Sequence, residues 1–128
     1  MRLLLDTHAV LWWFLDDPAL SPAARQAIGA ADAEVLVSAV SAMEVTTKFR
    51  LGKLPQAAAL ASRFEELVEG YGFAPLSITL RHASLAGSLQ LAHKDPFDRL
   101  LIAQALVEDV ALVSNERVFD PSGVQRLW

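Results

Sequence analysis

The sequence predicts an α/β protein with a mainly parallel sheet and helices on both faces. Short apolar runs alternate with segments of helix length, which is typical of strand–helix–strand units. The segments between these runs are long enough for right-handed crossovers between parallel strands. With 128 residues and 53% hydrophobic content, the chain is expected to bury one core, so residues 1–128 are interpreted as one domain.

The first elements are marked by an apolar run and by helix-forming segments. Arg2–Leu5 is a short apolar run and is expected to be a strand. Ala9–Leu15 follows it with helix length and no helix breaker. A serine–proline pair is a typical helix start, so the segment after it, Ala23–Ala31, is expected to be a second helix.

The middle of the chain is expected to continue the alternation. Val35–Val37 is a second apolar strand, and either of two following serines can cap a helix that ends before Gly52. Gln56–Glu69 repeats apolar residues at helical spacing, which predicts one more helix. Phe73–Ile78 contains a proline, which favours an edge strand over a central one.

The last third is expected to hold two helices and two strands. Thr79 can cap a short helix, and His93–Asp98 is a polar turn. Arg99–Val107 is an unbroken run of good helix formers. Val110–Val113 is a buried strand, and Val124–Trp128 is the candidate for the last strand.

Composition excludes several classes of protein. There is no cysteine, so a disulfide framework and a zinc–thiolate site are excluded, and a cytoplasmic location is expected. No apolar run is long enough to span a bilayer, so no membrane association is expected. The formal net charge of -4 argues against binding nucleic acid by phosphate neutralisation alone. A nucleic-acid enzyme of this composition would need bound cations or a local basic patch.

Acidic residues lie near the carboxyl ends of the predicted strands: Asp6, Glu44, Asp98 and Glu116. In open α/β sheets the functional crevice lies at these strand ends, so the four carboxylates are expected to converge. They would raise one another's pKa values unless a cation compensates their charge. Since only oxygen ligands are available, Mg²⁺ or Mn²⁺ is the expected ion.

Such an ion activates a bound water and neutralises charge on a phosphodiester, which indicates metal-assisted phosphate hydrolysis. On this hypothesis Asp6 and Asp98 hold the metal, and Glu44 orients it or the attacking water. Glu116 completes the site at its edge.

Four sequence blocks, in this order and spacing, resemble the PIN-domain toxins of the VapC type. They are Leu4-Leu5-Asp6-Thr7-His8, Ser38-Ala39-Val40-Ser41-Ala42-Met43-Glu44, the run from Asp95 to Ala105, and Leu127-Trp128. The resemblance covers essentially the whole chain. It implies a three-layer fold with about five parallel strands. It also implies the toxin of a type II toxin–antitoxin module: a Mg²⁺-dependent endoribonuclease of RNA that is commonly a homodimer and pairs with a VapB-type antitoxin.

On this resemblance the family's acidic residues fall on Asp6, Glu44 and Asp98, with Asp95 as a nearby alternative metal ligand. The fourth family carboxylate is usually an aspartate shortly after Thr or Ser, whereas this chain offers Ser114-Asn115-Glu116. The extra methylene puts direct metal contact by Glu116 in doubt. Supporting roles near substrate or ligands are assigned to Thr7, Ser114, Asn115 and Arg99, the last as a contact to substrate phosphate or as an ordinary ion pair.

Each acidic residue also has a purely structural interpretation. Asp6 and Asp98 could be helix N-caps, and Ser41 to Glu44 is a capping-box pattern. No familiar metal-ligand spacing links His8, His82 and His93, which are given no catalytic role. Only the set of carboxylates points to a site.

Two other functions remain open. A phosphoacceptor receiver domain also has this length and strand-end aspartates, although the acidic pair and late lysine expected of it are missing. A PIN domain that binds RNA or an antitoxin without cleaving is the second. Among Trp12, Trp13 and Phe14, at least one is expected to face outward, where it could anchor a protein partner.

Overall fold

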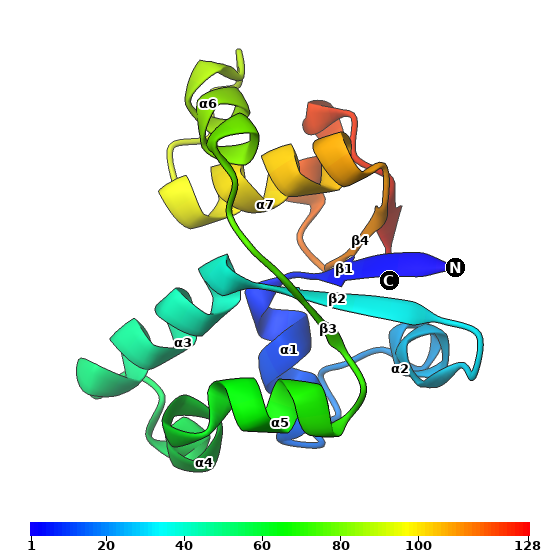
Figure 1. The fold of residues 1–128 in the computed structure, drawn as a ribbon, viewed down its shortest axis with the longest axis vertical. Helices are drawn as coiled ribbons and strands as arrows, with labels where there is room; N and C mark the ends of the chain where they lie inside the picture. Colours follow the sequence, from blue (N-terminus) through cyan, green and yellow to red (C-terminus); the bar gives the residue numbers. More distant parts are fainter.

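The computed structural model describes all residues from 1 to 128 and contains one five-stranded, all-parallel sheet (Figure 1). The strands are β1 (Arg2–Leu5), β2 (Glu34–Ser38), β3 (Ala74–Leu76), β4 (Ala111–Val113) and β5 (Arg126–Leu127). Their order across the sheet is β3-β2-β1-β4-β5. The predicted fold class is therefore confirmed, including the edge position of β3. Receiver domains have the strand order 2-1-3-4-5, so the observed strand order contradicts the phosphoacceptor receiver alternative.

Alternate residues of the central strand build two cores on the two faces of the sheet. Leu3 and Leu5 are fully buried in the larger cluster, beneath α1 and α2. Leu4 belongs to the second cluster, where it meets residues of α7. Figure 1 shows the result, with α6 and α7 on one side of the sheet and α1, α2, α4 and α5 on the other. A run of three leucines thus serves both layers, as expected of a strand buried on both faces.

The helices are α1 (Thr7–Phe14), α2 (Pro22–Gly29), α3 (Ala39–Arg50), α4 (Ala58–Ser62), α5 (Phe64–Gly70), α6 (Leu80–Ser88) and α7 (Pro96–Glu108), with 3₁₀ turns η1 (Pro55–Ala57) and η2 (Arg117–Ser122). None of these helices combines the length and hydrophobicity needed to cross a bilayer.

The prediction of a single helix over Gln56–Glu69 is wrong in one respect. This segment consists of η1, α4 and α5, and the helix is broken at Arg63. The backbone of Arg63 leaves helical geometry with φ -133° and ψ 35°. The break lets α4 pack against α3 and α5 against β3. Apolar spacing predicted the buried face of this segment but carries no signal for a bend.

Side-chain caps fix where the helices around the sheet begin. Asp6 caps α1, and its Oδ1 accepts the Ala9 N–H at 2.8 Å. Ser38 caps α3, which decides between the two candidate serines. Asp95 caps α7, followed by a proline in the first turn, so this helix begins at Pro96 rather than at Arg99. Asp6 and Ser38 lie at the carboxyl ends of β1 and β2, so α1 and α3 begin at the same edge of the sheet.

Candidate active site

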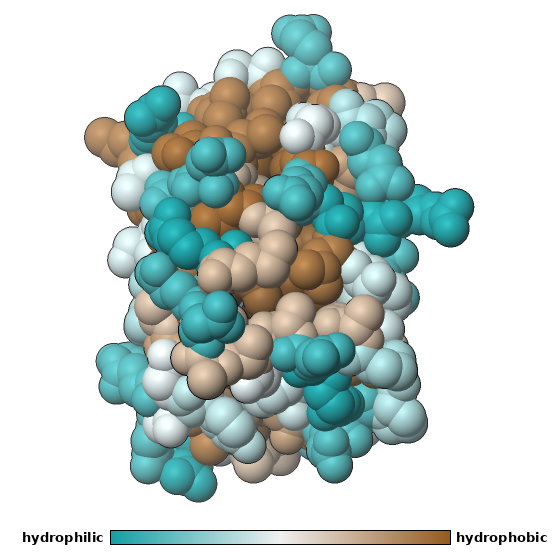
Figure 2. Space-filling model, turned by 90° about the vertical axis from the view of Figure 1, so that its right-hand side faces the viewer, coloured by the Kyte–Doolittle hydropathy of each residue, from teal (hydrophilic) through white to brown (hydrophobic).

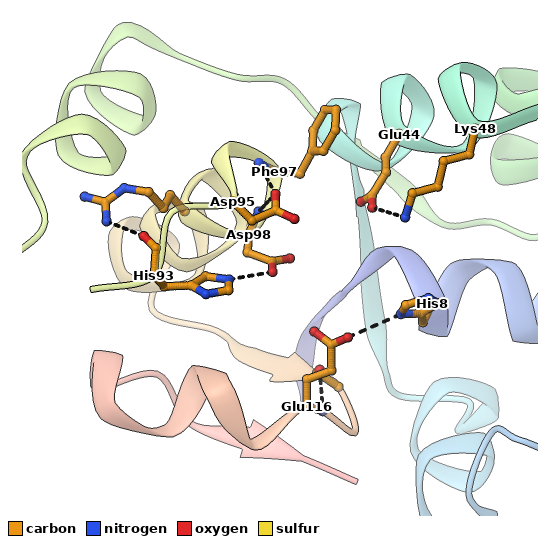
Figure 3. A network of polar contacts seen from close by, with 10 residues as sticks. His8, Glu44, Lys48, His93, Asp95, Phe97, Asp98 and Glu116 are labelled. Carbon is orange, nitrogen blue, oxygen red and sulfur yellow. Dashed lines mark hydrogen bonds and ion pairs between the residues drawn. The ribbon is translucent and has the colours of Figure 1, made fainter. Parts of the chain in front are cut away.

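Five acidic residues lie at the edge of the sheet where β1, β2 and β4 end: Asp6, Glu44, Asp95, Asp98 and Glu116. Asp6 follows β1 directly, Glu44 lies in the second turn of α3, and Asp98 lies in the first turn of α7. Figure 3 shows the carboxylates of Glu44, Asp95, Asp98 and Glu116 facing a common space at this edge. Because the strands are parallel, residues from distant parts of the sequence meet here.

Asp6 is the most deeply buried of these acids, with 3% of its surface exposed. Burial raises its pKa from 3.8 to about 6, and the nearby charge of Glu116 adds to the rise. Hydrogen bonds from Ser114 and from the Ala9 N–H act in the opposite direction, as does His8. The N-cap interpretation of Asp6 is confirmed, yet the cap leaves this carboxylate buried beside a second negative charge.

Asp98 is half-buried and bonded to a histidine. Its Oδ2 lies 2.6 Å from Nε2 of His93. Burial raises the pKa of Asp98, and the charges of Asp95 and Glu116 raise it further, while His93 lowers it. The N-cap interpretation of Asp98 is wrong, because Asp95 accepts the Phe97 and Asp98 N–H groups at 2.8 and 3.3 Å.

Glu44 is buried, and its Oε2 lies 2.7 Å from the ammonium group of Lys48, one helical turn further along α3. The capping-box interpretation of Ser41 and Glu44 is wrong, because α3 starts earlier, at Ala39. Ser41 instead shares a buried 3.1 Å hydrogen bond with Thr7. Thr7 therefore ties α1 to α3 beside the carboxylates.

Glu116 lies at the edge of the space with a partly exposed side chain. Its Oε1 is 3.6 Å from Nδ1 of His8, and its backbone N–H donates to the hydroxyl of Ser114. Ser114 is fully buried, whereas Asn115 is exposed. Of the two residues expected to support the site here, Ser114 is the one in contact with it.

Arg99 is bonded to backbone groups and makes no ion pair, so the ion-pair interpretation is wrong, while contact with substrate phosphate stays a prediction. Its guanidinium donates to four backbone carbonyls, those of Ala86, Leu89, Leu91 and His93, at 2.6 to 3.2 Å. The side chain therefore holds the connection between α6 and α7 in place. Its nearest link to the site is indirect, through the backbone of His93.

The donors present fit a hard divalent cation by their chemistry. All are oxygens, two of the carboxylates have raised pKa values, and the only lysine bonded to one of them, Lys48, is partly exposed. In the side-chain conformations of this structure, no three His, Asp or Glu groups converge on one point. Glu44 and Asp98 would have to exchange Lys48 and His93 for the ion.

Sequence reasoning missed the partners of the carboxylates. The spacing of Glu44 and Lys48 is that of an ion pair along a helix and could have indicated their contact. His93 and His8 reach Asp98 and Glu116 through turns, and no spacing rule predicts such contacts.

Comparisons with known proteins show the family to which this fold belongs. The PIN domain family model matches residues 3–121. The chain belongs to the PIN-domain family. It is 34% identical over 115 residues to Ribonuclease VapC22 of Mycobacterium tuberculosis, covering 89% of this chain and 86% of that protein. The resemblance to VapC-type PIN domains is thereby confirmed, and ribonucleases of this type generally depend on a divalent metal.

Solved structures share the PIN fold across almost the full chain. VapBC2 from Rickettsia felis, bound to a DNA fragment from its promoter, superposes with a TM-score of 0.73 at 15% identity, over 99% of this chain and 98% of that chain. FitAcB from Neisseria gonorrhoeae gives 0.67 at 18% identity, over 98% and 96%. At such identities these structures establish the three-layer PIN architecture.

Proposed function

We propose that this PIN-domain protein, residues 1–128, is the toxin of a type II toxin–antitoxin module and acts as a Mg²⁺-dependent endoribonuclease. The observation that carries the proposal is the common space faced by carboxylates from α3, α7 and the segment after β4 (Figure 3). Buried Asp6 lies close enough to Glu116 for the charge of Glu116 to raise its pKa. The similarity to a protein named as a ribonuclease over most of both chains supports the same activity.

Each acidic residue of the candidate site has a proposed role. Asp6 and Asp98 would hold the ion, Glu44 would orient it or the attacking water, and Asp95, the N-cap of α7, is the alternative ligand. Mg²⁺, or Mn²⁺ in its place, lowers the pKa of a bound water and neutralises charge on the phosphodiester. The Ser114 hydroxyl and the Ala9 N–H fix the Asp6 carboxylate, which limits its reorientation during the reaction. Glu116, next to His8, closes the edge of the site.

The proposed partners are RNA, a VapB-type antitoxin and a second copy of the chain. The structural neighbours are described as toxin–antitoxin complexes, which supports the antitoxin. Exposed apolar residues support contacts between proteins, since Leu80 is 91% exposed and Val118 46% exposed. Figure 2 shows apolar surface gathered in the upper half of one side, at the level of α6, α7 and η2.

Digestion of a mixed RNA pool tests the enzyme. The wild-type protein is expected to cleave with Mg²⁺ and to stop with EDTA. Asp6→Asn, which keeps the helix cap, is expected to lose cleavage, while Asp32→Asn, at an exposed position, is expected to retain it. Cleavage by a clean preparation of Asp6→Asn would refute the assigned site. RNA binding by the wild type without any cleavage would favour the binding-only alternative.

A further inference from the structure

The side chains of His8, Trp12 and Trp128 form an aromatic stack beside the carboxylate of Glu116. His8 and Trp12 are one turn apart on α1, and their rings lie nearly parallel, with centroids 5.2 Å apart and planes 20° apart. The ring centroid of Trp128 lies 5.7 Å from that of Trp12, and the two ring planes are 59° apart. Trp12 and Trp128 also pack against the larger core cluster.

Trp12 and Trp128 anchor the stack to the core, whereas His8 is exposed to solvent. Trp12 contacts the rings of both His8 and Trp128 and is only partly exposed. His8 forms the outer layer, and 44% of its side-chain surface is exposed. A flat ring that joins this stack therefore meets a surface that is already ordered, which lowers the entropic cost of binding.

The open layer lies at the rim of the candidate active site. His8 is two residues after Asp6, and its Nδ1 lies 3.6 Å from Oε1 of Glu116. In Figure 3, His8 lies beside Glu116, across the common space from Asp98. A group stacked on His8 would therefore be adjacent to a phosphodiester held at the carboxylates.

The chemistry of this rim favours a nucleobase over a phosphate. The neighbouring side chains are acidic, and the chain carries a net charge of -4, so the rim offers little attraction to a further phosphate. Every base has a π-face that stacks on aromatic side chains, and unpaired bases in single-stranded RNA are free to do so.

We propose that His8, backed by Trp12 and Trp128, stacks an unpaired base next to the cleaved phosphodiester and thereby selects single-stranded segments of the RNA substrate. This proposal rests on the proposed ribonuclease function. It assigns His8 a positioning role, in which the imidazole contacts a base and takes no part in bond cleavage.

The test pairs His8→Ala with His8→Phe, because phenylalanine keeps an aromatic face but loses the contact with Glu116. Binding of a fluorescent single-stranded oligoribonucleotide is measured in EDTA, where cleavage does not interfere. His8→Ala is expected to weaken binding by about tenfold, and His8→Phe to stay near the wild type. In the Mg²⁺-dependent digestion, His8→Ala is expected to raise KM with little change in kcat. Asp32→Asn, at an exposed position before the start of β2, serves as the control.

The possible results separate the two proposals. If the wild type neither binds nor cleaves RNA, the ribonuclease function itself fails. If the wild type cleaves and His8→Ala matches it in binding and KM, only the stacking proposal is overturned. Equal losses in His8→Ala and His8→Phe would assign the effect to Glu116 and also overturn it. A change in elution volume of His8→Ala on size exclusion, without a change in RNA affinity, would instead assign the stack to contact between protein copies.

Discussion

The hydroxyl of Ser38 donates a 2.6 Å hydrogen bond to Oε1 of Gln104, across 66 residues of sequence. Both side chains are buried, and Nε2 of Gln104 donates onward to the carbonyl of Ser77 at 3.3 Å. This network joins the end of β2, the middle of α7 and the segment that leads to α6. The sheet is thus linked by polar contacts to the helical layer of α6 and α7.

Replacing Gln104 by leucine is expected to lower the free energy of unfolding by about 1–3 kcal/mol, because the buried Ser38 hydroxyl loses its acceptor and the Ser77 carbonyl loses its donor. Urea unfolding followed by circular dichroism measures this change. Gln90→Leu, at an exposed position, is the matched control and should unfold like the wild type. A Gln104→Leu variant as stable as the wild type would show that the network adds no net stability.

The raised pKa of Asp6 predicts a pH-dependent stability in metal-free protein. Between pH 3.8 and about 6, the folded state retains a proton that the unfolded state has released. Stability is therefore expected to fall as pH rises through this window, by on the order of 3 kcal/mol from this group. Asp6→Asn removes the titration and keeps the cap. The difference in free energy of unfolding between wild type and Asp6→Asn, measured in EDTA from pH 3.5 to 7, should follow this curve, and a flat difference would contradict it.

Truncation of Arg99 is expected to destabilise the protein by about 1.5–3 kcal/mol, since four carbonyl groups lose a charged donor. Amide hydrogen exchange should rise in the segment between α6 and α7. Arg81→Ala, on an exposed face of α6, provides the comparison. Should Arg99→Ala raise KM for RNA and leave stability and exchange unchanged, the predicted contact with substrate phosphate would be supported instead.

Removal of Lys48 is expected to strengthen divalent-cation binding a few-fold, because its ammonium group competes for the Glu44 carboxylate at 2.7 Å. Isothermal titration with Mn²⁺ compares Lys48→Ala with Lys53→Ala, whose lysine is exposed. Weaker binding in Lys48→Ala would mean that the lysine orients Glu44 for the ion instead of competing with it.

The strands, and their alternation with helices along the chain, were predictable because parallel strands buried on both faces consist of short apolar runs, as in Arg2–Leu5. The end positions of several elements were not. The Asp95-Pro96 pair was interpreted as a turn, although proline is favoured in the first turn of a helix, and α7 accordingly begins there. The break at Arg63 depends on how α4 and α5 reach different neighbours, and local sequence does not encode that.

For the candidate site, the sequence predicted the edge of the sheet at which the acidic residues lie, and their role as metal ligands stays a prediction. Asp6, Glu44 and Asp98 lie at one edge because strand direction places them there, and strand direction follows from the connections. The contacts of each carboxylate with Lys48, His93 or His8 depend on side-chain conformations and loop paths. These features arise from tertiary packing, so a linear pattern did not contain them.

The two borders of the sheet are poor templates for strand addition. β5 spans only two residues, and β3 carries Pro75, which has no N–H to offer a neighbouring chain. Cross-β aggregation through these borders is therefore disfavoured even though the sheet is all-parallel and rich in leucine and valine. A second copy or an antitoxin is expected to attach through helical surfaces and to leave the hydrogen-bond ladder unextended.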